Sequence, residues 1–163
     1  MGVGKTTVSK ALKNSLQKSV FLDGDWCWDM NPFLVNNETR LMVMDNICYV
    51  LNNFIHCSAY DNIIFCWVLH EQQIIDSILS KLDIKNIQVV SISLLCSEKV
   101  LRERIQKDID NQLRSSDVIE RSIGRIHLYE KLDTVKIDVS EKTVAETAHE
   151  IMLLGQNTSC FRK

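Results

Sequence analysis

The sequence has no long apolar run, no excess of basic residues and no paired cysteine motif. Its longest uncharged apolar stretch, residues 63–69, is too short to span a bilayer. A formal net charge of −2 provides no general attraction to nucleic acid or to an anionic membrane. The N-terminus also lacks the basic, apolar and small-residue order of a signal peptide. We therefore expect a cytoplasmic chain that has neither nucleic acid nor a membrane as a partner.

The cysteines and histidines are scattered rather than grouped. None of the six cysteines forms a C-x-x-C pair, and most lie in apolar runs, which predicts buried free thiols. Cys66 and His70 are four residues apart, but no second pair completes a zinc site. A length of 163 residues suits one domain with its own core.

A phosphate-binding motif is present in the first residues. Residues 1–7 read M-G-V-G-K-T-T, which matches G-x-x-x-x-G-K-[ST] from the third position of that motif onward. In such a loop, backbone N–H groups and the start of the next helix hold nucleotide phosphates, which indicates ATP or GTP chemistry. We expect Lys5 to reach the β- and γ-phosphates and the Thr6 hydroxyl to bind Mg²⁺. The other nucleotide-binding positions of the loop are Gly2, Val3, Gly4 and Thr7.

Strand-like and helix-like segments alternate along the chain. Apolar residues at helical spacing after Lys5 predict a helix that begins there. Apolar runs predict strands at residues 20–22, 62–69, 88–95 and 134–139. Further helices are expected from about residue 38, at 74–82, from 97, at 118–128 and at 143–154, the last one capped by Gly155.

This alternation predicts an α/β fold in which helices cover both faces of a parallel sheet. Ligands then bind at the carboxyl ends of the strands. We assign residues 1–155 to a single domain and residues 156–163 to a loose C-terminal tail.

These features resemble the P-loop kinases of small molecules and nucleotides, a group that includes shikimate kinase, gluconate kinase and chloramphenicol phosphotransferase. The resemblance runs through G-V-G-K-T-T, D-G-D, L-C-S-E-K-V-L-R-E-R-I and I-D-V-S-E-K-T-V, and so covers nearly the whole chain. More closely, the chain is similar to bacterial ATP-binding and nucleotide-kinase-like proteins whose loop reads N-G-x-M-G-V-G-K-T-T. The resemblance implies a P-loop NTPase-type three-layer sandwich.

The resemblance also implies a sheet of strand order 2-3-1-4-5, from which this chain lacks strand 1. We expect the natural protein to begin roughly ten residues before Met1, with a strand that completes the sheet and supplies the missing loop glycine. The chain as given is then expected to bind ATP weakly and to self-associate through exposed strand edges.

Two aspartates and several aromatic residues follow the first predicted strand. Asp23 and Asp25 are two residues apart, so both side chains leave on the same face. The resemblance implies that Asp23 lies on the Mg²⁺ side and Asp25 on the acceptor side, and the reverse assignment stays open. The predicted strand 62–69 is not followed by an aspartate, so the metal would rely on Thr6 and Asp23. The candidate acceptor-binding residues are Asp25, Trp26, Trp28, Phe33 and Arg40.

The resemblance assigns most of the remaining site to basic residues. Arg102 and Arg104 correspond to arginines that approach the adenine and the phosphates. Arg114, Arg121 and Arg125 fall in a lid at about residues 106–125, with Arg114 and Arg121 expected to act on the transferred phosphate. The adenine-side loop contains Asp138, Ser140 and Lys142.

The sequence therefore predicts an ATP-dependent phosphotransferase with Mg²⁺ and a small hydroxyl-bearing acceptor, such as a nucleoside, a sugar-like metabolite or an antibiotic. A monophosphate acceptor needs arginines, and residues 1–101 contain only Arg40, which leaves a nucleoside-monophosphate kinase as an alternative. A second alternative is an ATP-binding module without phosphotransfer, or an inactive truncated form.

Overall fold

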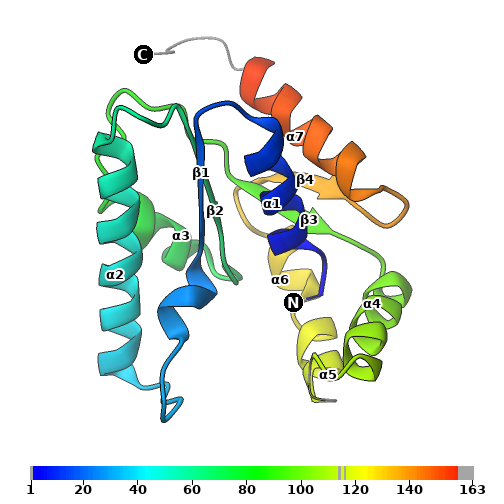
Figure 1. The fold of residues 1–163 in the computed structure, drawn as a ribbon. Helices are drawn as coiled ribbons and strands as arrows, with labels where there is room; N and C mark the ends of the chain where they lie inside the picture. Colours follow the sequence, from blue (N-terminus) through cyan, green and yellow to red (C-terminus); the bar gives the residue numbers. More distant parts are fainter. Residues whose placement is uncertain (1, 114, 116, 158–163) are drawn as a thin grey trace.

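The computed structural model describes residues 2–113, 115 and 117–157 (Figure 1). The N-terminal half contains α1 (Lys5–Ser15), β1 (Ser19–Asp23), the 3-10 helix η1 (Gly24–Trp28), α2 (Asn37–His56), β2 (Asn62–Cys66) and α3 (Gln72–Leu79). The C-terminal half contains β3 (Ile92–Leu95), α4 (Glu98–Asp110), α5 (Val118–Ile123), α6 (Ile126–Glu130), β4 (Val135–Asp138) and α7 (Val144–Asn157). The predicted alternation of strands and helices is confirmed.

The strands form two parallel pairs. β1 pairs with β2, with Asp23 opposite Cys66, and β3 pairs with β4, with Ile92 opposite Val135. These pairs match strands 2-3 and 4-5 of the predicted order. In the described parts of the chain, no strand lies between β2 and β3, as expected for a sheet without strand 1.

Helix α1 holds the two strand pairs together. Its buried residues Val8 and Leu12 form a cluster with Ala148 of α7, and Ile64 of β2 and Leu94 of β3 pack against that cluster. Figure 1 shows α1 and α7 side by side on one side of the β1–β2 pair, with α2 on the other side. Apolar packing on α1 therefore connects two strand pairs that share no backbone ladder in the described residues.

Helix α2 supplies the core of the N-terminal half. A reciprocal capping box starts it: Thr39 N–H donates to Oδ1 of Asn36 at 2.9 Å, and Asn36 N–H donates to Oγ1 of Thr39 at 3.0 Å. Val43 and Ile47 on its inner face are fully buried and pack with Leu22 of β1. The long helix thus fixes the outer face of the β1–β2 pair.

The predicted strands 62–69 and 88–95 are too long, because each ladder stops where its partner stops. β2 ends at Cys66, opposite the last residue of β1. β3 begins only at Ile92, opposite the first residue of β4. A continuous apolar run indicates the presence of a strand but carries no information about the length of its partner.

Two predicted helix boundaries are also wrong. The helix expected over residues 118–128 is divided into α5 and α6, with Gly124 as the C-cap of α5. The last helix continues through Gly155 to Asn157 instead of ending near Leu154. The Gly155 carbonyl accepts a hydrogen bond from the Gln88 side chain at 3.3 Å, which satisfies one of the carbonyls at the end of the helix. Residues 158–163 of the predicted tail lie outside the described residues.

Among the described helices, none is long and apolar enough to cross a membrane.

The α2 core predicts a sharp contrast between two positions on one helix. Replacement Ile47→Ala removes a side chain with 0% exposure and should lower the free energy of unfolding by about 3 kcal/mol. Replacement Leu41→Ala removes a side chain with 64% exposure and should change it by less than about 0.5 kcal/mol. Urea unfolding of the two variants measures the difference, and equal losses would show that the α2 packing described here is wrong.

Candidate active site

The phosphate-binding motif forms a tight loop that leads into α1. Gly2 (φ 79°) and Gly4 (φ 101°) both have left-handed backbone, which favours glycine. A Cβ at Gly2 would lie 2.5 Å from Cγ1 of Ile105, so a larger residue does not fit without movement. Gly4 is the N-cap of α1, and none of the described side chains caps this helix start. The N–H groups of the first turn, from Lys5 onward, are therefore suited to bind an anion.

Thr6 and Asp23, the predicted metal ligands, lie in contact. The Thr6 hydroxyl donates a hydrogen bond to Oδ2 of Asp23 at 2.7 Å. Asp23 ends β1, is 5% exposed, and accepts the backbone N–H of Asp25 on its Oδ1 at 3.1 Å. A hydroxyl and a carboxylate are oxygen ligands of the kind that Mg²⁺ takes, together with water and phosphate oxygens. The pair therefore fits the predicted magnesium site.

The predicted magnesium site has only two protein ligands among the described residues, Thr6 and Asp23. In the described residues, no three His, Cys, Asp or Glu side chains are grouped to hold a metal ion. Mg²⁺ commonly keeps several waters and binds through one or two carboxylates plus substrate phosphates. The arrangement therefore suits a metal that arrives with a nucleotide better than a permanently bound ion.

Cys66 is a third side chain at this point, and the sequence did not predict it here. Its Sγ lies 4.0 Å from Oγ1 of Thr6, and its backbone is opposite Asp23 in the β1–β2 ladder. Burial, followed by the Asp23 carboxylate, raises the pKa of the Cys66 thiol to about 11, although the Ser9 and Thr6 hydroxyls and Lys5 act in the opposite direction. Cys66 is therefore a neutral thiol at physiological pH. The parallel register of two strand ends is the signal that would have revealed it.

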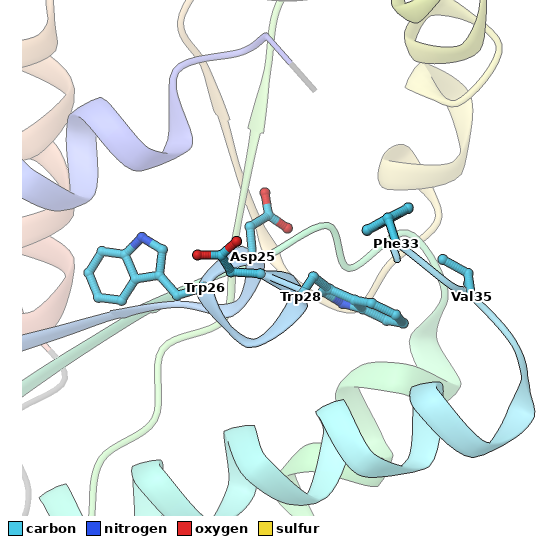
Figure 2. A pocket seen from close by; sticks show the side chains of 6 residues that line it. Asp25, Trp26, Trp28, Phe33 and Val35 are labelled. Carbon is cyan, nitrogen blue, oxygen red and sulfur yellow. The ribbon is translucent and has the colours of Figure 1, made fainter. Parts of the chain in front are cut away.

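A pocket of about 690 Å³ lies next to Thr6, Asp23 and Cys66, on the turn that follows Asp23. It is lined by Asp25, Trp26, Trp28, Asp29, Phe33 and Val35. Figure 2 shows Asp25 between Trp26 and Trp28 on the turn, with Phe33 and Val35 on the segment that leads to α2. The volume is typical of small-molecule sites.

The aromatic walls of the pocket are held by packing. Trp26 makes an edge contact with Phe21 of β1, with ring centroids 5.3 Å apart. Trp28 packs against the α2 core and lies 6.1 Å from the Phe33 ring. Trp26 and Phe33 nevertheless remain 55% and 68% exposed, so most of their apolar surface faces solvent. A bound molecule would cover that surface.

The structure brings together four of the five predicted acceptor residues. Arg40 is the exception: it lies on the exposed side of α2 and is not among the residues that line the pocket. Asp29 and Val35 line the pocket but were not predicted. Asp29 lies four residues after Asp25, across the single turn η1, and this spacing is a signal that sequence reasoning could have used.

The predicted arginines near α4 contact other groups of the chain. Arg102 forms ion pairs with Glu98 and Glu120, both at 2.9 Å. Arg121 forms an ion pair with Asp117 at 3.3 Å. Both arginines are therefore paired with carboxylates, and the Arg102–Glu120 pair connects α4 to α5.

Arg104 has a different position, between the phosphate-binding loop and the end of β4. Its Nη1 donates to the Val3 carbonyl at 3.2 Å and its Nη2 donates to the Val139 carbonyl at 2.8 Å. Arg104 therefore supports the loop through the backbone. Arg125 is the N-cap residue of α6, and Arg114 lies outside the described residues.

The predicted adenine-side loop is ordered by its own hydrogen bonds. The Ser140 hydroxyl and N–H both donate to Oδ1 of Asp138, at 2.6 and 2.8 Å, and they lower the pKa of that carboxyl. Ser140 also accepts the N–H of Ser97 at 2.9 Å, and Lys142 pairs with Glu150 at 2.6 Å. The loop is thereby tied to the start of α4.

Comparison with known proteins identifies the family. A family model described as an AAA domain matches residues 1–123. The chain belongs to this AAA domain family. No curated protein sequence matches the chain.

Solved structures show how widely the fold of this AAA domain chain is shared. A gluconokinase from Sinorhizobium meliloti 1021 has a TM-score of 0.67 at 18% identity, with 96% of this chain and 90% of that chain covered. The tunicamycin resistance protein of Deinococcus radiodurans has a TM-score of 0.66 at 13% identity, covering 92% of this chain and 90% of that chain. A sugar kinase from Janibacter sp. HTCC2649 has a TM-score of 0.65 at 16% identity, covering 97% and 90%. The AAA domain chain therefore has the P-loop kinase fold that the sequence predicted.

The position of Asp23 opposite Cys66 in the β1–β2 ladder predicts a change in thiol reactivity. Replacement Asp23→Asn removes a charge that raises the pKa of Cys66, so more thiolate forms at a given pH. Alkylation of Cys66 by iodoacetamide in mildly alkaline buffer, followed by mass spectrometry, should become faster by about 3- to 10-fold. Asp25→Asn is the matched control and should leave the rate unchanged. Equal alkylation rates in the wild type and Asp23→Asn, with both proteins folded, would contradict the effect of the Asp23 charge on Cys66.

Proposed function

We propose that this AAA domain chain is an ATP-dependent phosphotransferase that moves the γ-phosphate to a small hydroxyl-bearing acceptor. The Thr6–Asp23 hydrogen bond of 2.7 Å is the observation that supports this most directly. It joins the helix start that carries the phosphate-binding motif to the turn that lines the aromatic pocket. Phosphoryl transfer needs such a juxtaposition, because its catalysis consists mainly of positioning and charge neutralisation.

The donor side of the proposed reaction is formed by the loop and α1. Lys5 and the first-turn N–H groups hold the β- and γ-phosphates of ATP. Thr6 and Asp23 hold Mg²⁺, which supplies charge neutralisation on those phosphates when it is bound. Arg121, with Arg114, is proposed to act on the transferred phosphate after exchanging its ion pair with Asp117 for the phosphate oxygens.

Asp25 is proposed to act on the acceptor. Its carboxylate accepts the proton of the acceptor hydroxyl as the oxygen of that hydroxyl bonds to the γ-phosphorus. The bond between the γ-phosphorus and the β,γ-bridging oxygen breaks, and ADP leaves with that electron pair. Asp25 lines the pocket and its N–H is bonded to Asp23, so the proposed base lies beside the proposed metal ligand.

The pocket lining argues for a hydroxyl acceptor over a phosphorylated one. A nucleoside-monophosphate kinase needs basic side chains around the acceptor phosphate. Arg40, the residue that kept this alternative open, is not part of the lining.

An ATP-binding module without phosphotransfer is the second candidate. The pairing of Arg102 and Arg121 with carboxylates, and of Arg104 with backbone carbonyls, favours this binding module, because these arginines are then not placed to stabilise a transferred phosphate.

Replacement Lys5→Ala tests the nucleotide site. We expect the affinity for ATP, measured by calorimetry with Mg²⁺, to fall by about 10-fold or more, because Lys5 contributes a charge to the β- and γ-phosphates. Lys10→Ala, an exposed position on the same helix, should bind as the wild type does. Unchanged binding by Lys5→Ala would contradict the nucleotide site.

Replacement Asp25→Asn separates the two candidates. A phosphotransferase should lose on the order of 10²-fold in the rate of ADP formation, because the base is gone, while ATP affinity stays the same. The rate is measured over a panel of alcohols, nucleosides and sugars, with nucleoside monophosphates in parallel. Turnover of the monophosphates alone would rule out the hydroxyl preference, and absence of turnover over the whole panel would favour the binding module.

A further inference from the structure

The charge of the acceptor pocket has one sign. Its lining contains two carboxylates, Asp25 and Asp29, and none of the described lining residues is Lys, Arg or His. An acceptor that carries a carboxylate or phosphate would therefore meet two carboxylates and, among the described lining residues, no basic side chain. The lining thus disfavours sugar acids as well as phosphorylated acceptors.

Asp29 is the carboxylate that the proposed phosphotransfer does not use. It is exposed and follows the last residue of η1 as its C-cap. Within the described parts of the chain, no hydrogen bond or ion pair engages its side chain. A ligand that fills the pocket removes water from this carboxylate, which is unfavourable unless the ligand supplies a donor or a positive charge.

The aromatic rings provide a second, independent reason to expect a positively charged ligand. Trp26, Trp28 and Phe33 line the pocket, and Trp26 and Phe33 present more than half of their surface to solvent. The faces of aromatic rings carry negative potential and attract organic ammonium groups, with tryptophan the strongest. The same rings cover apolar groups of a ligand.

We propose that the acceptor is an amino alcohol, a hydroxyl-bearing molecule with a protonated amine and an apolar or aromatic body. The ammonium group lies at Asp29 and an adjacent ring face, the apolar body packs between Trp26, Trp28 and Phe33, and the hydroxyl faces Asp25. The inference rests on the proposed function for the role of that hydroxyl. Charge and shape at Asp29 then determine which alcohols bind.

Three probes with one common core test the charge preference. 2-Amino-1-phenylethanol, 1-phenyl-1,2-ethanediol and mandelate share a phenyl ring on a hydroxyl-bearing carbon and differ only in a cationic, neutral or anionic end group. Binding to the full chain is followed by tryptophan fluorescence at neutral pH without nucleotide. We expect the amine to bind about 10-fold more tightly than mandelate, with the diol in between. Equal affinities for the amine and the diol, or tighter binding of mandelate, would overturn the proposal.

The variant Asp29→Asn assigns the preference to one residue. It should bring the amine close to the diol in affinity and leave the diol unchanged within about twofold, because only a charge is lost. Glu38→Gln, which removes an exposed carboxylate outside the pocket, should keep the wild-type order. A preference that persists in Asp29→Asn would overturn the role of Asp29.

Phosphotransfer is measured separately, as ADP formation from ATP and Mg²⁺ with each probe. Selective binding of the amine without ADP formation from any alcohol would overturn the proposed function and leave the ligand class standing. ADP formation at equal rates from the amine and the diol would support phosphotransfer and overturn the amino alcohol.

Discussion

The hydrogen bond between Thr6 and Asp23 is the contact on which the candidate site depends. It connects the first turn of α1 to the end of β1, and it uses a carboxylate that is almost completely buried. The second oxygen of that carboxylate accepts the N–H of Asp25 and so sets the start of η1. One side chain therefore fixes both the helix start that is suited to phosphate and the turn that lines the pocket. Each of the two donors offsets part of the cost of burying this carboxylate, so loss of either one makes its burial less favourable.

The remainder of the fold keeps α1 in the position that this contact requires. Because the described β2 and β3 do not pair, the register between the two halves comes from side chains instead: Val8 and Leu12 pack between Ile64 and Leu94. Arg104 adds a polar tie between the loop and β4 through two backbone carbonyls. Apolar packing is less directional than a β-ladder. The hydrogen bonds of Arg104 and of Asp23 therefore do much to fix the relative positions of the site residues.

The sequence predicted the features that depend on neighbouring residues. It did not predict those that depend on a distant segment of the same chain. The loop glycines and the start of α1 both follow from the short phosphate-binding motif. The lengths of β2 and β3, the position of Cys66 and the ion pair of Arg102 with Glu120 depend on residues distant in the chain. A residue pattern gives the periodicity of one segment but does not identify the segment that it pairs with or packs against. Asp29 was missed for another reason: its spacing from Asp25 across η1 is the only signal that marks it.

The candidate site contains residues that the fold constrains and residues that it leaves free. The chain has the fold of a gluconokinase and of a tunicamycin resistance protein at 18% and 13% identity, so few of its side chains are needed for the fold itself. Gly2 and Asp23 belong to the constrained part, since one lacks space for a Cβ and the other is buried. Trp26, Asp29 and Phe33 are exposed and contribute little to the core, so their identity is not dictated by stability. Under the proposed phosphotransfer, the residues that stability leaves undetermined would select the acceptor, because they gather around a pocket beside the constrained phosphate-binding loop.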